Sequence, residues 1–257
     1  MQSKKILRAL LFLLPTLPAH AIDKDLPNFN SYTYFGLSGG YGNIKSSREP
    51  FIIKSGLINQ IQDQNTFIGL LNVNPENGGA SGRIYTGFSA KISNRFPISL
   101  GPEIGYSHYA SSTVSASEHI AFDPYVDLNY NDQITNKAYG LDLLLNASFT
   151  YQRIILSLKP GVQYAIQKGT VYSRLTAAQE GEELIDLPLR NSKFKTNKVL
   201  PEIAFQAKWQ VIPNKPVFLG LSYQYVHGQK TDNYEDNKFD QVNTRNMASI
   251  DIELHFS

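Results

Sequence analysis

The chain has 257 residues, of which 42% are apolar and 12% aromatic, with no cysteine and a formal net charge of +2 at pH 7. This composition is too apolar and too aromatic for a disordered chain. The lack of cysteine excludes disulfides, thiolate metal sites and cysteine nucleophiles. The mean hydropathy of −0.27 excludes a polytopic helical membrane protein, and the near-neutral charge argues against a nucleic-acid-binding protein.

Residues 1–21 have the pattern of a secretory signal peptide. Three cations precede an apolar run over 9–17, and an Ala-x-Ala ending closes at Ala21. A membrane-spanning helix needs about 20 apolar residues, so the short run favours cleavage after Ala21 over a membrane anchor. Residues 22–31 then form a predicted short polar lead-in to a single domain over 32–257. Loss of the leader leaves 21 Lys and Arg against 22 Asp and Glu.

Alternation of apolar and polar residues recurs eight times after this leader. A period of two is typical of β-strands whose two faces meet different surroundings. The predicted strands span residues 32–43, 82–93, 98–110, 137–150, 153–166, 198–211, 217–228 and 244–256.

The predicted connections alternate between short and long. The short ones lie at 94–97, 150–152 and 212–216, and the long ones at 44–81, 111–136, 167–197 and 229–243. An up-and-down meander with all its tight turns at one end produces this order. Bacterial outer-membrane barrels have short periplasmic turns and long extracellular loops. The sequence therefore predicts an all-β fold, an antiparallel up-and-down transmembrane β-barrel of eight strands.

One face of each predicted strand carries no charge. In the strand over 137–150, for example, Leu141, Leu143 and Leu145 share a face, and Asp142 lies on the other. A Lys or Arg facing lipid at the midplane costs about 2–4 kcal/mol, so lipid outside the barrel explains the pattern. A soluble sandwich or lipocalin-like barrel with its apolar face inward also predicts alternation. It does not explain strands of about 11–13 residues, because soluble strands usually have about 5–6.

Aromatic residues gather at the two ends of the apolar faces, as they do at membrane interfaces. The set near the long loops is Tyr106, Tyr139, Tyr164, Tyr223 and Tyr225, and the set near the short turns is Phe149, Tyr151, Trp209 and Phe256.

Three prolines, Pro102, Pro160 and Pro201, interrupt predicted strands. Proline donates no hydrogen bond to a ladder, and a closed barrel has no edge at which to place it. We therefore expect bulges or local shortening of the strands at these positions.

Four segments carry a resemblance to a known group. They are the leader running into Tyr34-Phe35-Gly36-Leu37-Ser38-Gly39-Gly40-Tyr41, the glycine-rich start of a strand at 78–88, the phrase Gly101-Pro102-Glu103-Ile104-Gly105-Tyr106 echoed at 159–164 and 200–205, and the alternating end at 250–256. Over residues 32–256 the chain is similar to the small eight-stranded outer-membrane β-barrel proteins of Gram-negative bacteria, the OmpA/OmpX and opacity-type group.

The resemblance implies a place in the bacterial outer membrane, in contact with its lipids and lipopolysaccharide. It also implies insertion by the barrel-assembly machinery, with the terminal aromatic Phe256 as the assembly signal. In this chain Phe256 is followed by Ser257, so the aromatic is penultimate. Members of such groups serve as adhesins, small pores, stabilising proteins or lipid-modifying enzymes, so the resemblance specifies architecture and leaves activity open.

The charged residues of the strands fall on the predicted lumen face. They comprise Arg83, Lys91, Glu103, Asp142, Lys159, Glu202, Lys208, Asp251 and Glu253, with Lys198 and Arg245 beside them. An eight-stranded barrel holds only its own side chains or one small ligand, and buried charges must be paired. The set therefore predicts a lumen charge network of mutual ion pairs. A narrow pore of mixed charge, with little ion selectivity, is the alternative.

Catalytic patterns are weak. Ser107 adjoins His108, but neighbouring residues of a strand point to opposite faces. Ser222 and His227 are separated by an odd number of positions, so they also lie on opposite faces. The chain has no metal-ligand spacing, nucleophile elbow or phosphate-binding glycine loop. We therefore predict no enzyme and no cofactor, and a lipid-modifying outer-membrane enzyme is the third alternative.

The long connections are the remaining candidates for function, because loops on a rigid scaffold often bind ligands. Residues 44–81 contain the apolar pieces 51–53 and 67–71, and residues 167–197 contain clustered charges of both signs. The leading hypothesis is an outer-membrane surface protein of structural or interaction type, with adhesin-like binding of a host or surface ligand through these loops.

Overall fold

The computed structural model describes residues 31–45, 67–68, 72–76, 78–92, 96–122, 126–179, 185–213, 215–229 and 243–256. The predicted signal peptide, and the lead-in up to residue 30, lie outside the described residues. So do the apolar piece 51–53 and most of 67–71. No helix in the described segments is long and apolar enough to cross a membrane.

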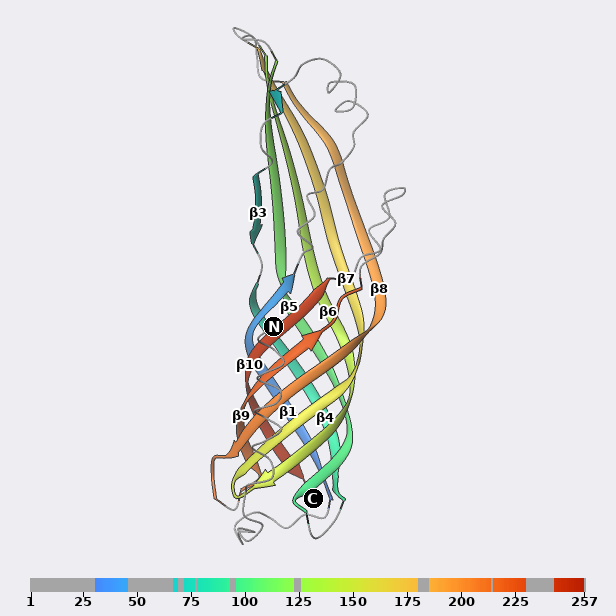
Figure 1. The fold of residues 1–257 in the computed structure, drawn as a ribbon, viewed down its shortest axis with the longest axis vertical. Helices are drawn as coiled ribbons and strands as arrows, with labels where there is room; N and C mark the ends of the chain where they lie inside the picture. Colours follow the sequence, from blue (N-terminus) through green and yellow to red (C-terminus); the bar gives the residue numbers. More distant parts are fainter. Residues whose placement is uncertain are drawn as a thin grey trace.

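The described chain folds into one antiparallel sheet that closes on itself (Figure 1). Its strands are β1 (Ser31–Lys45), β2 (Phe67–Ile68), β3 (Asn72–Glu76), β4 (Gly79–Lys91), β5 (Ile98–Phe122), β6 (Val126–Tyr151), β7 (Ile154–Gln179), β8 (Ile185–Gln210), β9 (Val217–Val226) and β10 (Thr244–Phe256). β1 pairs with both β4 and β10, and the β5–β6 pairing completes a ring of eight strands, β1 and β4 to β10. The predicted eight-stranded up-and-down barrel is confirmed.

The last residues of β4, β6 and β8 and the first residues of β5, β7 and β9 lie at the same end of the barrel as the last residue of β10 (Figure 1). We call this the turn end. The connection between β6 and β7 is reduced to Gln152 and Arg153, and Gln152 adopts a positive φ of 51°.

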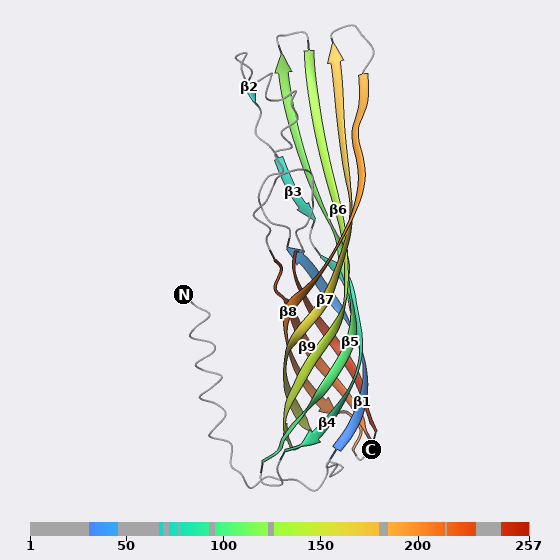
Figure 2. The same cartoon turned by 90° about the vertical axis from the view of Figure 1, so that its right-hand side faces the viewer.

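Four strands are far longer than predicted. β5 to β8 contain 25 or 26 residues each, so most of 111–136 and 167–197 is strand and not loop. These upper parts leave the ring as a curved four-stranded sheet, which we call the extension sheet (Figures 1 and 2). β2 and β3 pair with β5 along one side of it. Val114, Thr135, Val171 and Tyr172 in these segments are β-branched or aromatic, and such residues favour strands.

The predicted bulges at the prolines are absent. Pro102, Pro160 and Pro201 all face outward, and the registers of β4–β5 and β6–β7 are unchanged on either side of the first two. Two residue pairs are missing from each of these ladders beside the proline. The expected shortening holds only at Pro201, where the β8–β9 pairing stops at Glu202. A short gap in the ladder thus accommodates the missing amide hydrogen of Pro102 and of Pro160.

The outer surface of the ring is apolar and the interior is polar, as the alternation predicts. Leu143 and Val199 are 59% and 64% exposed, whereas Asp142 and Lys159 are 1% exposed. Aromatic side chains face outward near both ends, including Tyr106 and Tyr164 toward the extension sheet and Trp209 and Phe256 at the turn end. Apolar side chains around a closed ring match a lipid-facing band, so the fold is a transmembrane, outer-membrane-type β-barrel.

Candidate functional site

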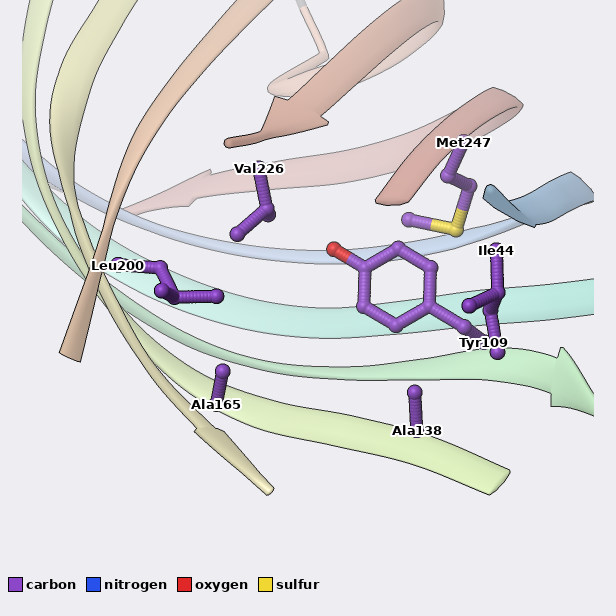
Figure 3. Packing of buried hydrophobic residues seen from close by; sticks show 7 residues of the cluster. All are labelled: Ile44, Tyr109, Ala138, Ala165, Leu200, Val226 and Met247. Carbon is purple, nitrogen blue, oxygen red and sulfur yellow. The ribbon is translucent and has the colours of Figure 1, made fainter. Parts of the chain in front are cut away.

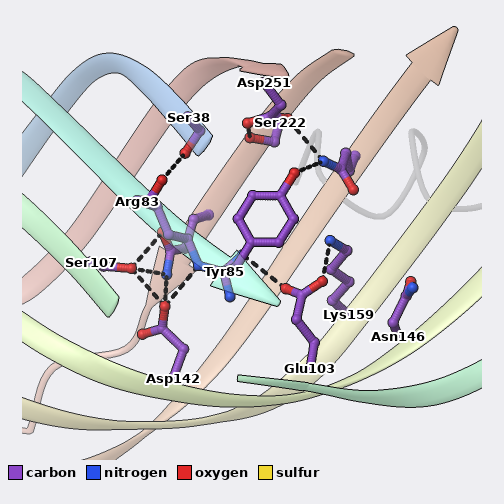
Figure 4. Close-up of polar contacts among 12 residues, drawn as sticks. Ser38, Arg83, Tyr85, Glu103, Ser107, Asp142, Asn146, Lys159, Ser222 and Asp251 are labelled. Carbon is purple, nitrogen blue, oxygen red and sulfur yellow. Dashed lines mark hydrogen bonds and ion pairs between the residues drawn. The ribbon is translucent and has the colours of Figure 1, made fainter. Parts of the chain in front are cut away.

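Glu103 is the centre of the lumen network (Figure 4). Its carboxylate lies 2.8 Å from Nη1 of Arg83 and 2.6 Å from Nζ of Lys159. The hydroxyl of Tyr34 donates a third contact at 2.8 Å. These partners come from β1, β4 and β7, so one carboxylate on β5 ties together strands from around the ring.

Asp142 on β6 forms a second cluster on the side nearer the extension sheet. Its Oδ2 accepts from Nε of Arg83 at 2.7 Å and from the Ser107 hydroxyl at 2.6 Å, and its Oδ1 accepts from Gln163 Nε2 at 2.6 Å. Arg83 therefore bridges Asp142 and Glu103. Gln224 extends this cluster by donating to Glu202.

Glu253 forms the third cluster, at the turn end. Lys208 donates to its Oε1, and Nε2 of His255 lies 2.6 Å from the same oxygen. The hydroxyl of Tyr85 donates to Oε2 at 3.0 Å. Asp251 lies nearby and accepts from Ser222 at 2.9 Å.

Of the eleven charged residues assigned to the lumen by sequence, nine lie inside the barrel and are buried, Arg245 among them. The other two, Lys91 and Lys198, are half-buried, and neither is part of the three clusters. The network also uses Tyr34 and Tyr85, which the charge-based assignment omitted. The sequence could have predicted their position, because both tyrosines occupy the alternate positions of their strands that face the lumen. Nζ of Lys159 lies 4.8 Å from the centre of the Tyr85 ring, within cation–π range.

Two glycines make room for these tyrosines. Tyr34 pairs with Gly87, and Gly36 pairs with Tyr85, across the β1–β4 ladder. A Cβ at Gly87 would lie 2.4 Å from Tyr34 Cζ, and one at Gly36 would lie 2.2 Å from Tyr85 Cζ. Each ring therefore lies over a glycine of the neighbouring strand.

We expect Gly87→Ala to lower the free energy of unfolding by about 1–3 kcal/mol, the usual cost of overpacking. The added methyl group would push the Tyr34 hydroxyl away from Glu103. Denaturant unfolding of the detergent-refolded barrel measures the change. Gly39→Ala is the matched control, because a Cβ at Gly39 has nothing within 4 Å. Equal stability of the two variants would contradict this account of the glycines.

An apolar layer crosses the lumen on the extension-sheet side of the charge network, and Figure 3 shows how its side chains lie. Its members come from seven different strands and are Ile44, Tyr109, Ala138, Ala165, Leu200, Val226 and Met247. Gln163 joins the two regions by donating to the Tyr109 hydroxyl at 3.2 Å. A cavity of about 10 Å³ between Met247 and the charge network is close to the space that one water molecule needs. The side chains of the charge network and of the apolar layer are buried, so they occupy the described part of the lumen.

The candidate catalytic pairs are held apart, as their parity predicts. Ser107 is buried and bonded to Asp142, whereas His108 faces outward. Ser222 is bonded to Asp251 inside the barrel, and His227 is exposed. The described residues include no group of three or more His, Asp or Glu that could hold a metal ion.

No protein-family model and no curated protein matches the chain. Similar solved structures include Ail of Yersinia pestis (10% identity, 89% of this chain and 100% of that chain, TM-score 0.38) and Neisserial surface protein A (14% identity, 87% and 97%, TM-score 0.36). A third is the outer membrane protease OmpT of Escherichia coli (9% identity, 91% and 99%, TM-score 0.30). The likeness to these outer-membrane barrels concerns the fold alone. It carries no statement about binding or catalysis.

Proposed function

We propose that this chain is a surface protein of the bacterial outer membrane that binds a ligand on another surface through its extension sheet. The observation that carries the proposal is the continuation of β5 to β8 beyond the ring as a hydrogen-bonded sheet. The barrel is the anchor, and the extension sheet is the part that reaches outward. This is an adhesin-like role with a folded sheet in place of flexible loops.

The anchor fits the outer membrane. Its apolar belt would contact outer-membrane lipids and lipopolysaccharide. Phe256 faces outward at the turn end and is 51% exposed, where assembly machinery would meet it as an insertion signal. The filled lumen supports an anchor over a small pore, because ion conduction needs a continuous aqueous path. The separation of Ser107 from His108 likewise gives the lipid-modifying enzyme no support.

The extension sheet suits binding because its backbone is already ordered. An ordered surface loses less conformational entropy on association than a mobile loop does. Its outward face presents hydrogen-bonding groups and an aromatic ring, including Asn131, Gln133, Tyr172 and Lys193. Tyr172 is 37% exposed, and an exposed tyrosine offers a large contact area at low entropic cost.

Shortening the two hairpins of the extension sheet tests the proposal. Thr113 pairs with Thr135, and Thr170 pairs with Lys193. Replacing 114–134 and 171–192 by Asn-Gly would therefore close each hairpin with a favoured two-residue turn. We expect Escherichia coli cells that display the shortened chain to adhere to an epithelial monolayer about tenfold less than cells displaying the full chain, since most of the exposed sheet is lost.

The control for this experiment replaces residues 230–242 by a short turn and leaves the extension sheet intact. Both variants should show the boiling-dependent gel shift of a folded outer-membrane barrel. Undiminished adhesion of the hairpin-shortened variant, with the gel shift retained, would contradict the proposed function.

A further inference from the structure

A sharp change of polarity marks where the outer face of the barrel meets the extension sheet. Along β6 the outward positions are apolar from Phe149 to Tyr139, and the next outward residue is Lys137. On β7 the corresponding change is from Ile166 to Lys168. On β8 the apolar residues end at Val199, and Asn197 and Lys195 follow.

The height of this boundary matches one face of a bilayer. On β8 the outward apolar residues run from Trp209 to Val199, a distance of ten residue steps along the strand. At about 3.3 Å per residue and a tilt of about 35–45°, that run spans about 25 Å. This is the height of the apolar band of outer-membrane barrels. The lysines therefore lie at the level of the lipid headgroups, on the side opposite the turn end.

The strand register places these lysines side by side. Lys137 pairs directly with Lys168, and Lys168 pairs directly with Lys195. All three side chains are exposed, and Lys193 lies one outward position further along β8. Like charges directly opposite each other destabilise a sheet. We call these four residues the lysine row.

The described ladder neighbours of the lysine row include no carboxylate. On the outward face they are Thr135, Tyr139, Ile166, Thr170, Tyr172, Asn191 and Asn197. Nζ of Lys168 lies 5.3 Å from the centre of the Tyr139 ring. Tyr139 in turn packs with Tyr106 at a centroid distance of 6.5 Å. Tyrosines of this kind mark the membrane–water interface.

We propose that the lysine row binds the phosphate groups of phosphorylated lipids in the outer leaflet. A lipid phosphate would lie between adjacent ammonium groups and remove their mutual repulsion, while the acyl chains would cover the apolar positions below. Basic residues at a membrane surface attract anionic lipids. The boundary position favours a lipid headgroup over a soluble anion. The inference rests on the proposed membrane location and does not depend on adhesion by the extension sheet.

Lipid retention tests the proposal. The full chain is folded in nanodiscs of phosphatidylcholine with added bis-phosphorylated lipid A, transferred to a neutral detergent, and analysed by native mass spectrometry. We expect the triple variant Lys137→Gln, Lys168→Gln, Lys195→Gln to retain lipid A about 10- to 100-fold more weakly than the unmodified chain. A dephosphorylated lipid A should not distinguish the two proteins.

The matched control removes three cations from the turn end, with Lys91→Gln, Arg153→Gln and Lys215→Gln. It should retain lipid A as the unmodified chain does. Equal retention by all three proteins, or equal loss in both triple variants, would overturn the inference. Displacement of lipid A by micromolar inorganic phosphate would mean that the lysine row binds free phosphate, and the proposed lipid ligand would be wrong. A retained boiling-dependent gel shift would show that each variant still folds as an outer-membrane barrel, so a change in lipid retention would not reflect misfolding. The adhesion assay tests the proposed function separately.

Discussion

Glu103→Gln should lower the free energy of unfolding by about 3–5 kcal/mol, the typical cost of removing one partner from a buried ion pair. The substitution conserves shape, removes the negative charge and replaces one acceptor oxygen by an NH2 donor. Arg83 and Lys159 would remain inside the barrel without the carboxylate that they share. The ion pairs lost are the guanidinium contact of Arg83 at 2.8 Å and the ammonium contact of Lys159 at 2.6 Å. Water cannot take over these contacts, because the two cations are 8% and 1% exposed.

The measurement is denaturant unfolding of the refolded barrel in detergent micelles, with the fraction folded read from the boiling-dependent gel shift. Asn131→Ala serves as the control, because an exposed residue on the extension sheet and outside the lysine row should change stability by no more than about 0.5 kcal/mol. A loss below about 1 kcal/mol for Glu103→Gln would mean that the buried contacts add little to stability.

A double-mutant cycle sharpens this test. Lys159→Met alone should also be costly, since it leaves Glu103 with less compensating charge. The double variant Glu103→Gln, Lys159→Met should cost less than the sum of the single changes, because neither partner is then left unpaired. Simple additivity would show that the two side chains do not act as a pair. Arg83 remains paired with Asp142 at 2.7 Å throughout the cycle.

Sequence reasoning could predict the ring because lipid outside and a polar lumen inside impose alternation on every strand. It could not predict the length of β5 to β8. Beyond Tyr139 on β6, the outward residues Lys137, Thr135 and Gln133 are polar, so the apolar outward face ends there. The alternation that predicts the ring depends on an apolar face toward lipid, and it weakens where no lipid covers that face, although the strand continues.

The lumen illustrates the same limit at the level of single residues. The alternation of residues between the two faces of a strand was sufficient to place Asp142 and Lys159 inside the barrel. It could not identify partners, since these depend on the register between strands, which is a property of pairing across the ring. The contact of Glu103 with Tyr34 joins residues 69 positions apart. Lys91 has the lumen parity but lies at the last residue of β4, where the barrel opens.

Leu143→Arg should lower the free energy of unfolding by about 2–4 kcal/mol when the barrel is folded in a lipid bilayer, the cost of a cation at the midplane. Leu143 lies near the middle of the outward run of β6 and is 59% exposed at the barrel surface. The guanidinium would face acyl chains, with no water to solvate it. Unfolding from phospholipid vesicles by denaturant measures the change.

Gln133→Arg is the matched control for this change. It lies on the same strand and the same outward face, but within the extension sheet, beyond Lys137. We expect a change within about 0.5 kcal/mol there, as for other exposed surface substitutions. A large cost at Leu143 with none at Gln133 would place the lipid boundary between them, at the level of the lysine row. Equal costs would mean that lipid does not surround the ring at Leu143, and the apolar belt would then need another cover.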